Sequence, residues 1–172
     1  MKTKLFRTFL ILSVLLVIII SPGTALADNR NFTAHLTGGE EVPARETLAT
    51  GQTVFKLSKD GTALHYRLIV ANINNVVAAH IHLGAAGANG PVVAFLAGPF
   101  TAGGGRTDGV LAEGTITAAN LTGPLAGHPL SDLIAAMETG NAYVNVHTND
   151  GVAPPNTGPG DFPGGEVRGQ IH

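Results

Sequence analysis

Short apolar runs, many of them alternating with polar residues, recur from Phe32 to Ile171, separated by glycine, proline, asparagine and aspartate. A period of two is typical of antiparallel strands, whose successive side chains point to opposite faces. Asp60-Gly61 lies between two such runs and predicts a tight hairpin. In all, the pattern predicts about eight strands, over residues 32–36, 54–57, 64–70, 76–83, 92–96, 111–116, 142–147 and 166–171.

One segment has the period of a helix. Its apolar residues at positions 130, 133, 134 and 137 share one helical face, Ser131 or Asp132 is suited to the N-cap, and Gly140 to the C-terminal cap. We therefore expect an all-β fold, an antiparallel β-sandwich or Greek-key barrel with one short helix near 131–139. Glycine and proline predict loops at 84–90, 98–109 and 148–164, the last longer than a connector needs.

Residues 1–27 have the pattern of a cleaved secretion signal. A basic start precedes an apolar run from Phe9 to Ile20, and Ala25-Leu26-Ala27 fits a signal-peptidase site. The prediction is a mature chain that begins at Asp28, forms a single domain over 28–172 and is secreted or extracytoplasmic, in a periplasm or at a cell surface. An uncleaved N-terminal anchor is the alternative, and no later segment is apolar enough to span a membrane.

Charge and composition exclude several functions. The formal net charge is −2, and it becomes −5 without Lys2, Lys4 and Arg7, so nothing favours nucleic acid as a partner. The absence of cysteine excludes disulfides, thiolate metal sites and cysteine nucleophiles. The sequence also lacks a nucleophile-elbow serine motif, a phosphate-binding loop and a dinucleotide-binding motif, so a non-catalytic role is favoured.

Three histidines are candidate metal ligands. His80 and His82 are two apart in a predicted strand and share a face, and His147 lies on the polar face of a later strand. If these strands are neighbours, three imidazoles meet outside the core, a donor set that suits copper or zinc. The alternative is that they brace loops by binding backbone carbonyls. The other histidines are expected at the surface: His35, His65, His128 and His172.

The last strand carries two charges on one face. Glu166 and Arg168 alternate with Val167, Gly169 and Ile171. We interpret them as structural cross-strand salt-bridge partners, worth at most about 1 kcal/mol if exposed, and expect Val167 and Ile171 to be buried.

Four motifs carry a family resemblance: GGEEVPARETLATG at 38–51, AAHIHLGAAGANGPVV at 78–93, GNAYVNVHT at 140–148 and FPGGEVRGQIH at 162–172. Together they resemble the chordin-type (CHRD) domain of chordin and of many exported microbial proteins. The resemblance implies an immunoglobulin-like β-sandwich or Greek-key barrel, and it implies little about activity.

A weaker resemblance is to copper/zinc superoxide dismutase. It places His80 and His82 on the first two copper ligands of that family and His147 on the last. The bridging ligand, the zinc histidines and the paired cysteines have no counterpart, and Glu166 stands where that family has a guiding arginine. This resemblance implies copper binding with weak or no dismutase activity.

Two functions follow from the sequence. The first is an exported, non-catalytic module that binds an extracellular protein or polymer through its glycine- and proline-rich loops. The alternative is a copper-binding protein that uses His80, His82 and His147.

Overall fold

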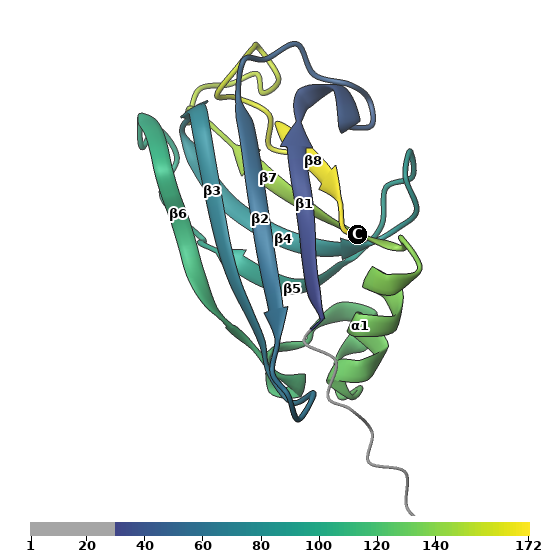
Figure 1. Ribbon diagram of the computed structural model, residues 1–172. Helices are drawn as coiled ribbons and strands as arrows, with labels where there is room; N and C mark the ends of the chain where they lie inside the picture. The colour runs from purple at the N-terminus through teal and green to yellow at the C-terminus, as the bar shows by residue number, and fades with distance from the viewer. Residues whose placement is uncertain (1–29) are drawn as a thin grey trace, which may run out of the picture.

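The computed structural model describes residues 30–172, and the secretion signal predicted at 1–27 lies outside the described residues. Eight strands form one antiparallel sheet in the order β5-β4-β7-β8-β1-β2-β3-β6. The sheet curls until its edge strands, β5 and β6, lie against each other, so it is nearly closed into a barrel (Figure 1). The predicted all-β antiparallel class is confirmed. The strand bounds are β1 Asn31–Thr37, β2 Thr50–Leu57, β3 Leu64–Asn74, β4 Val76–Leu83, β5 Val92–Ala97, β6 Arg106–Ile116, β7 Ala142–Thr148 and β8 Val167–Gln170.

The barrel has two halves joined by β8. Strands β1, β2, β3 and β6 lie side by side in front in Figure 1, and β4, β5 and β7 cross behind them at a steep angle. Strand β8 pairs with β7 from Tyr143↔Gln170 to Val146↔Val167, and with β1 at Thr37↔Arg168. This short strand therefore completes the sheet.

The core fills the space between the halves. Strand β2 buries every second residue, as its sequence predicts, and Val167 and Ile171 are fully buried, as expected. Three short 3-10 helices, at Gly38–Glu40, Ala118–Asn120 and Gly123–Leu125, lie in the connections. No helix among residues 30–172 is long and apolar enough to cross a membrane.

The one α-helix of residues 30–172, α1 (Leu130–Glu138), buries the four apolar residues that share its predicted face and packs near β7 (Figure 1). Gly140 follows it at φ +67°, a conformation that glycine adopts without steric cost. The predicted N-cap is wrong: Pro129 occupies that position, and no side chain caps the helix. Asp132 instead accepts a hydrogen bond of 2.8 Å from His128 Nδ1, which draws its carboxylate away from the helix terminus.

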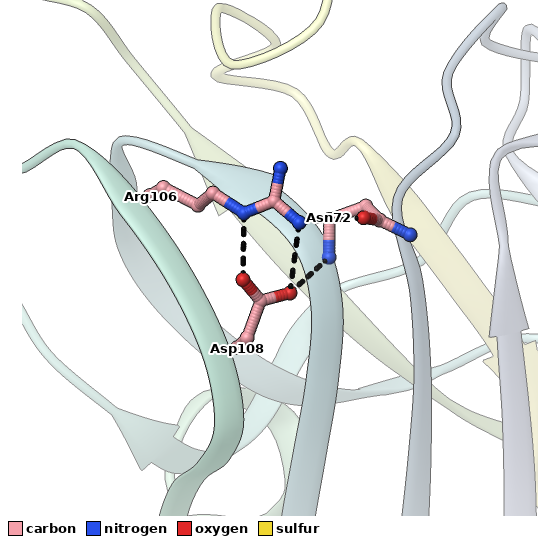
Figure 2. A network of polar contacts seen from close by, with 3 residues as sticks. All are labelled: Asn72, Arg106 and Asp108. Carbon is pink, nitrogen blue, oxygen red and sulfur yellow. Dashed lines mark hydrogen bonds and ion pairs between the residues drawn. The ribbon is translucent and has the colours of Figure 1, made fainter.

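Strand β6 begins at Arg106, inside the segment predicted as a loop. The pairing of β3 with β6 shifts register between Val70 and Ile73, where Asn72 has φ +57°. Figure 2 shows how this irregularity is held: Asp108 accepts the Asn72 N–H at 2.7 Å and pairs with Arg106 at 2.6 Å. Side chains thus hold β6 to β3 where the regular ladder is interrupted.

Candidate metal centre

Strand pairing brings the three candidate ligands together. Strand β4 pairs with β7 so that Ala78 is opposite His147, and His82 is opposite Tyr143. The three histidines share the face directed away from the core, and no two of their ligand nitrogens are farther apart than 4.8 Å. His82 is buried, and His80 and His147 are half-buried.

Backbone carbonyls determine which ring nitrogens carry protons. His82 Nδ1 lies 2.9 Å from the Gly90 carbonyl oxygen and His147 Nδ1 lies 3.0 Å from that of Pro163. Because a carbonyl oxygen only accepts, both Nδ1 atoms donate, and the Nε2 atoms of His82 and His147 carry the lone pairs of these rings.

His80 completes the cluster. Its Nδ1 lies 3.1 Å from His147 Nε2, so it donates to that lone pair in this arrangement. The Nε2 atoms of His80 and His82 are buried and have no hydrogen-bond partner. Two buried, unpaired imidazole nitrogens are a cost that a bound ion would remove.

Aromatic side chains enclose the cluster. The Phe95 ring meets His80 edge-on at 4.6 Å between ring centroids, and Tyr143 stacks on His82 at 4.9 Å. On the other face of Tyr143 the Arg168 guanidinium lies 3.5 Å from the ring centroid. Neither Phe95 nor Tyr143 is predicted as a site residue from the sequence, although strand alternation puts Tyr143 on the same face as His147.

The histidines are held neutral. Burial, followed by the charges of His147 and His82, lowers the pKa of His80 from 6.5 to about 4. Burial, offset in part by the Pro163 hydrogen bond, lowers that of His147 to about 4, and burial also lowers the pKa of His82. Neutral imidazole is the form that binds metal ions.

A second buried polar group lies next to the histidines. Glu41, from the β1–β2 connection, accepts a hydrogen bond of 3.3 Å from Asn145 Nδ2, and its Oε1 has no partner. A Cβ placed on Gly165 would lie 2.6 Å from that Oε1, so glycine allows this close approach. Burial raises the pKa of Glu41 from 4.5 to about 7, although the charges of Arg168 and Arg45 act in the opposite direction. Sequence reasoning missed Glu41 because it lies in a loop rather than on the strand face.

The salt-bridge role expected for Glu166 is wrong, since none of the ion pairs of the described residues includes it. Its side chain is fully buried. The hydroxyls of Thr47 and Thr148 donate to it at 2.6 and 2.7 Å, and the Gly160 N–H at 2.8 Å. Thr47 lies in the β1–β2 connection and Gly160 in the β7–β8 loop, so Glu166 joins both loops to the sheet.

The salt-bridge role expected for Arg168 is wrong as well, and only 1% of this residue is exposed. It donates to the carbonyl oxygens of Ala85 and Ala88 at 3.0 and 2.9 Å. No ion pair of the described residues joins it to Glu166. The expectation for the remaining histidines is confirmed, since all four are exposed: His35, His65, His128 and His172.

Beside the histidines, the long β7–β8 loop forms a shallow groove of about 430 Å³ with Ala102. Val152, Ala153 and Pro155 line it, together with Pro163, whose carbonyl binds His147. The groove is mainly apolar and adjoins the histidine cluster.

Fold and site together define a class of small all-β domains in which a cluster of polar side chains lies on one outer face of the sheet, beside long loops. The CHRD domain family matches residues 32–171, and the chain belongs to this family. No curated protein and no solved structure matches the chain. The predicted family is thus confirmed, and the likeness to copper/zinc superoxide dismutase stays a prediction.

Proposed function

We propose that this CHRD protein is an exported copper-binding protein, with His80, His82 and His147 as the ligands. The observation that carries the proposal is the pair of buried, unpartnered Nε2 atoms beside a third imidazole. Loop bracing, the alternative role, explains the Nδ1 hydrogen bonds of His82 and His147 but leaves those Nε2 atoms unexplained. Carbonyl partners of this kind orient the ligands in metal sites.

The donor set supports copper over zinc. Nitrogen sites bind Cu(II) more tightly than Zn(II) in the general order of affinities. A ligand nitrogen lies about 2.0 Å from its ion, so two ligands are at most about 4 Å apart, and the widest pair here would close by up to about 1 Å. A bound ion would also take the His147 Nε2 lone pair, to which His80 Nδ1 donates in the free protein. When bound, copper supplies a Lewis-acidic, redox-active centre.

Copper loading followed by dialysis tests the proposal. One copper ion per chain should remain in the wild type and be lost in His82→Ala. The matched control is His35→Ala, which removes an exposed histidine outside the cluster and should retain the ion. Copper retained equally by all three proteins, or by none, would reject the site.

Export is the second part of the proposal. The motif at 25–27 and the CHRD family support a secreted form that begins at Asp28. N-terminal sequencing of the extracytoplasmic fraction should give Asp28 as the first residue. A membrane-bound species that keeps residues 1–27 would show an anchor instead.

The groove supports a second candidate function, a non-catalytic module that binds an extracellular protein or polymer. An insoluble cell-wall polysaccharide should then co-sediment the protein. Val152→Asp should abolish this, because Val152 is 66% exposed and lines the groove, whereas His82→Ala should not. Equal sedimentation of both variants would reject the groove as the binding surface.

A further inference from the structure

The proposed copper site contains no anion. Its three ligand residues are histidines, and the cluster includes no carboxylate. A copper ion there would keep its full charge, since neutral imidazoles donate electron pairs without neutralising it. The charge of the ion therefore depends on what surrounds the ligands.

The nearest cation adds positive charge. Arg168 stacks on Tyr143, which stacks on His82, so the guanidinium lies one ring away from a ligand. Its acceptors are neutral: two backbone carbonyls and, at 3.4 Å, Asn89 Oδ1. None of the ion pairs among residues 30–172 includes Arg168.

The nearby buried carboxylates are engaged elsewhere. Both oxygens of Glu166 accept hydrogen bonds from Thr47, Thr148 and Gly160. Glu41 is bound to Asn145, and neither acid hydrogen-bonds to a histidine. The charged group stacked next to the imidazoles is thus the Arg168 guanidinium, and no carboxylate is hydrogen-bonded to them.

The site is also partly shielded from water, with two histidines half-buried and one buried. His82 is only 8% exposed, and Phe95 lies edge-on against His80. The cost of burying an ion grows with the square of its charge, about four times greater for a divalent than for a monovalent ion. Cu(II) also prefers tetragonal coordination and would need a further ligand from solvent.

We propose that the site holds copper as Cu(I) in preference to Cu(II), and that Phe95 is the apolar cover that sets this preference. The inference rests on the proposed copper site. In the redox step, bound Cu(II) gains one electron from an external reductant such as ascorbate, which is oxidised, and all three histidines stay neutral. Phe95 acts as a positioning residue through water exclusion and binds no ion itself.

Two competition titrations, both carried out in the absence of oxygen, test the preference for Cu(I). Bicinchoninate with ascorbate competes for Cu(I), and nitrilotriacetate competes for Cu(II). The wild type should bind Cu(I) at least about tenfold more tightly, which raises the reduction potential by about 59 mV above that of aqueous copper. Phe95→Asp should lower this ratio about tenfold, because it admits water and brings an anion to His80.

The variants have matched controls. Phe95 is 53% exposed, so its substitution should leave the fold intact, which circular dichroism checks. Phe95→Leu keeps an apolar cover and should retain the wild-type ratio. Phe100→Asp puts the same carboxylate at another exposed phenylalanine and should also change nothing.

The outcomes separate the two proposals. Equal or tighter binding of Cu(II) overturns the inference and leaves the copper site standing. An unchanged ratio in Phe95→Asp overturns the role of Phe95. Binding of neither ion overturns the proposed function, and the inference with it.

Discussion

The two halves of the barrel obey the same alternation with opposite results on their outer faces. In β2 the burial alternates strictly, and the outward side chains are exposed. In β7 nearly every residue is buried, on both faces. The difference comes from the loops, since β1, β2, β3 and β6 form an open half. In the covered half, formed by β4, β5, β7 and β8, the 38–49, 84–90 and 149–165 segments contact the outward side chains of β4, β7 and β8.

The covered half shows how backbone can organise polar side chains. Loop carbonyls and N–H groups bind His82, His147, Glu166 and Arg168, so these side chains are oriented before any ligand arrives. Buried polar groups need such partners, whereas the exposed polar side chains of the open half hydrogen-bond to water. Substitutions should therefore have large effects in the covered half and small effects in the open half.

The largest effect is expected at Gly169, where β8 approaches β1. A Cβ there would overlap the backbone carbonyl of His35, so Gly169→Ala should destabilise the protein by about 4 kcal/mol or more. Chemical denaturation measures this loss. Gly39→Ala is the control, because the nearest atom to its Cβ is 3.9 Å away. Similar stability of the two variants would show that β8 can move away from β1 at little cost.

Next is Glu166→Gln, which replaces a buried carboxylate that accepts three hydrogen bonds with a neutral amide. We expect a loss of about 3 kcal/mol, because the amide offers one acceptor oxygen instead of two and loses the charge that strengthens these bonds. In the open half, Glu113→Gln should change stability by less than about 0.5 kcal/mol, because this side chain is 68% exposed and lies 3.7 Å from Arg67. Equal losses in a denaturation series would contradict the contrast between the halves.

Glu41→Gln should change how stability depends on pH. The pKa of Glu41 is raised by burial to about 7, so its contribution is fully present below about pH 4.5 and is lost as pH rises through 7. Glutamine cannot ionise, so the variant should gain roughly 2–3 kcal/mol relative to the wild type between pH 4.5 and 8. Parallel stability curves for the two proteins would show that Glu41 is not buried as described.

Copper binding should resist acid. An ordinary imidazole would lose its ion as pH falls through about 6. Because the pKa values of His80 and His147 are lowered to about 4, affinity should stay nearly constant down to about pH 5 and decline towards pH 4. Competition titrations across this range measure it, and half-loss near pH 6.5 would contradict the burial of the cluster.

The smallest effect is expected in the surface network of Figure 2. Asp108→Ala removes the partner of Arg106 and the acceptor of the Asn72 N–H. Water replaces both contacts at this exposed site, so the melting temperature should fall by no more than about 3 °C. A larger fall would mean that the β3–β6 irregularity controls the open half.

Alternation and turn residues predict the fold well because both are local signals. All eight strands and the helix lie where the sequence indicates them, and the hairpin at Asp60-Gly61 joins β2 to β3. The start of β6 is missed, because Gly109, at φ +97°, is typical of a loop and yet lies within the strand.

The candidate site is predictable only in part. The shared face of His80 and His82 follows from their spacing, but their approach to His147 depends on β4 and β7 being neighbours, more than sixty residues apart in sequence. The burial of Glu166 and Arg168 depends on loops that fold over the strand, and no local pattern encodes that. Strand periodicity gives the face of a side chain and not what covers it.

The position of β8 has a consequence for the order of folding. Thr33 and His172 exchange backbone hydrogen bonds of 2.8 and 3.0 Å, so the halves are joined by residues 139 apart in sequence. Such long-range closure is slow, and until Val167–Gln170 is synthesised β1 and β7 keep open edges. Closure of the barrel therefore waits until β8 has been synthesised.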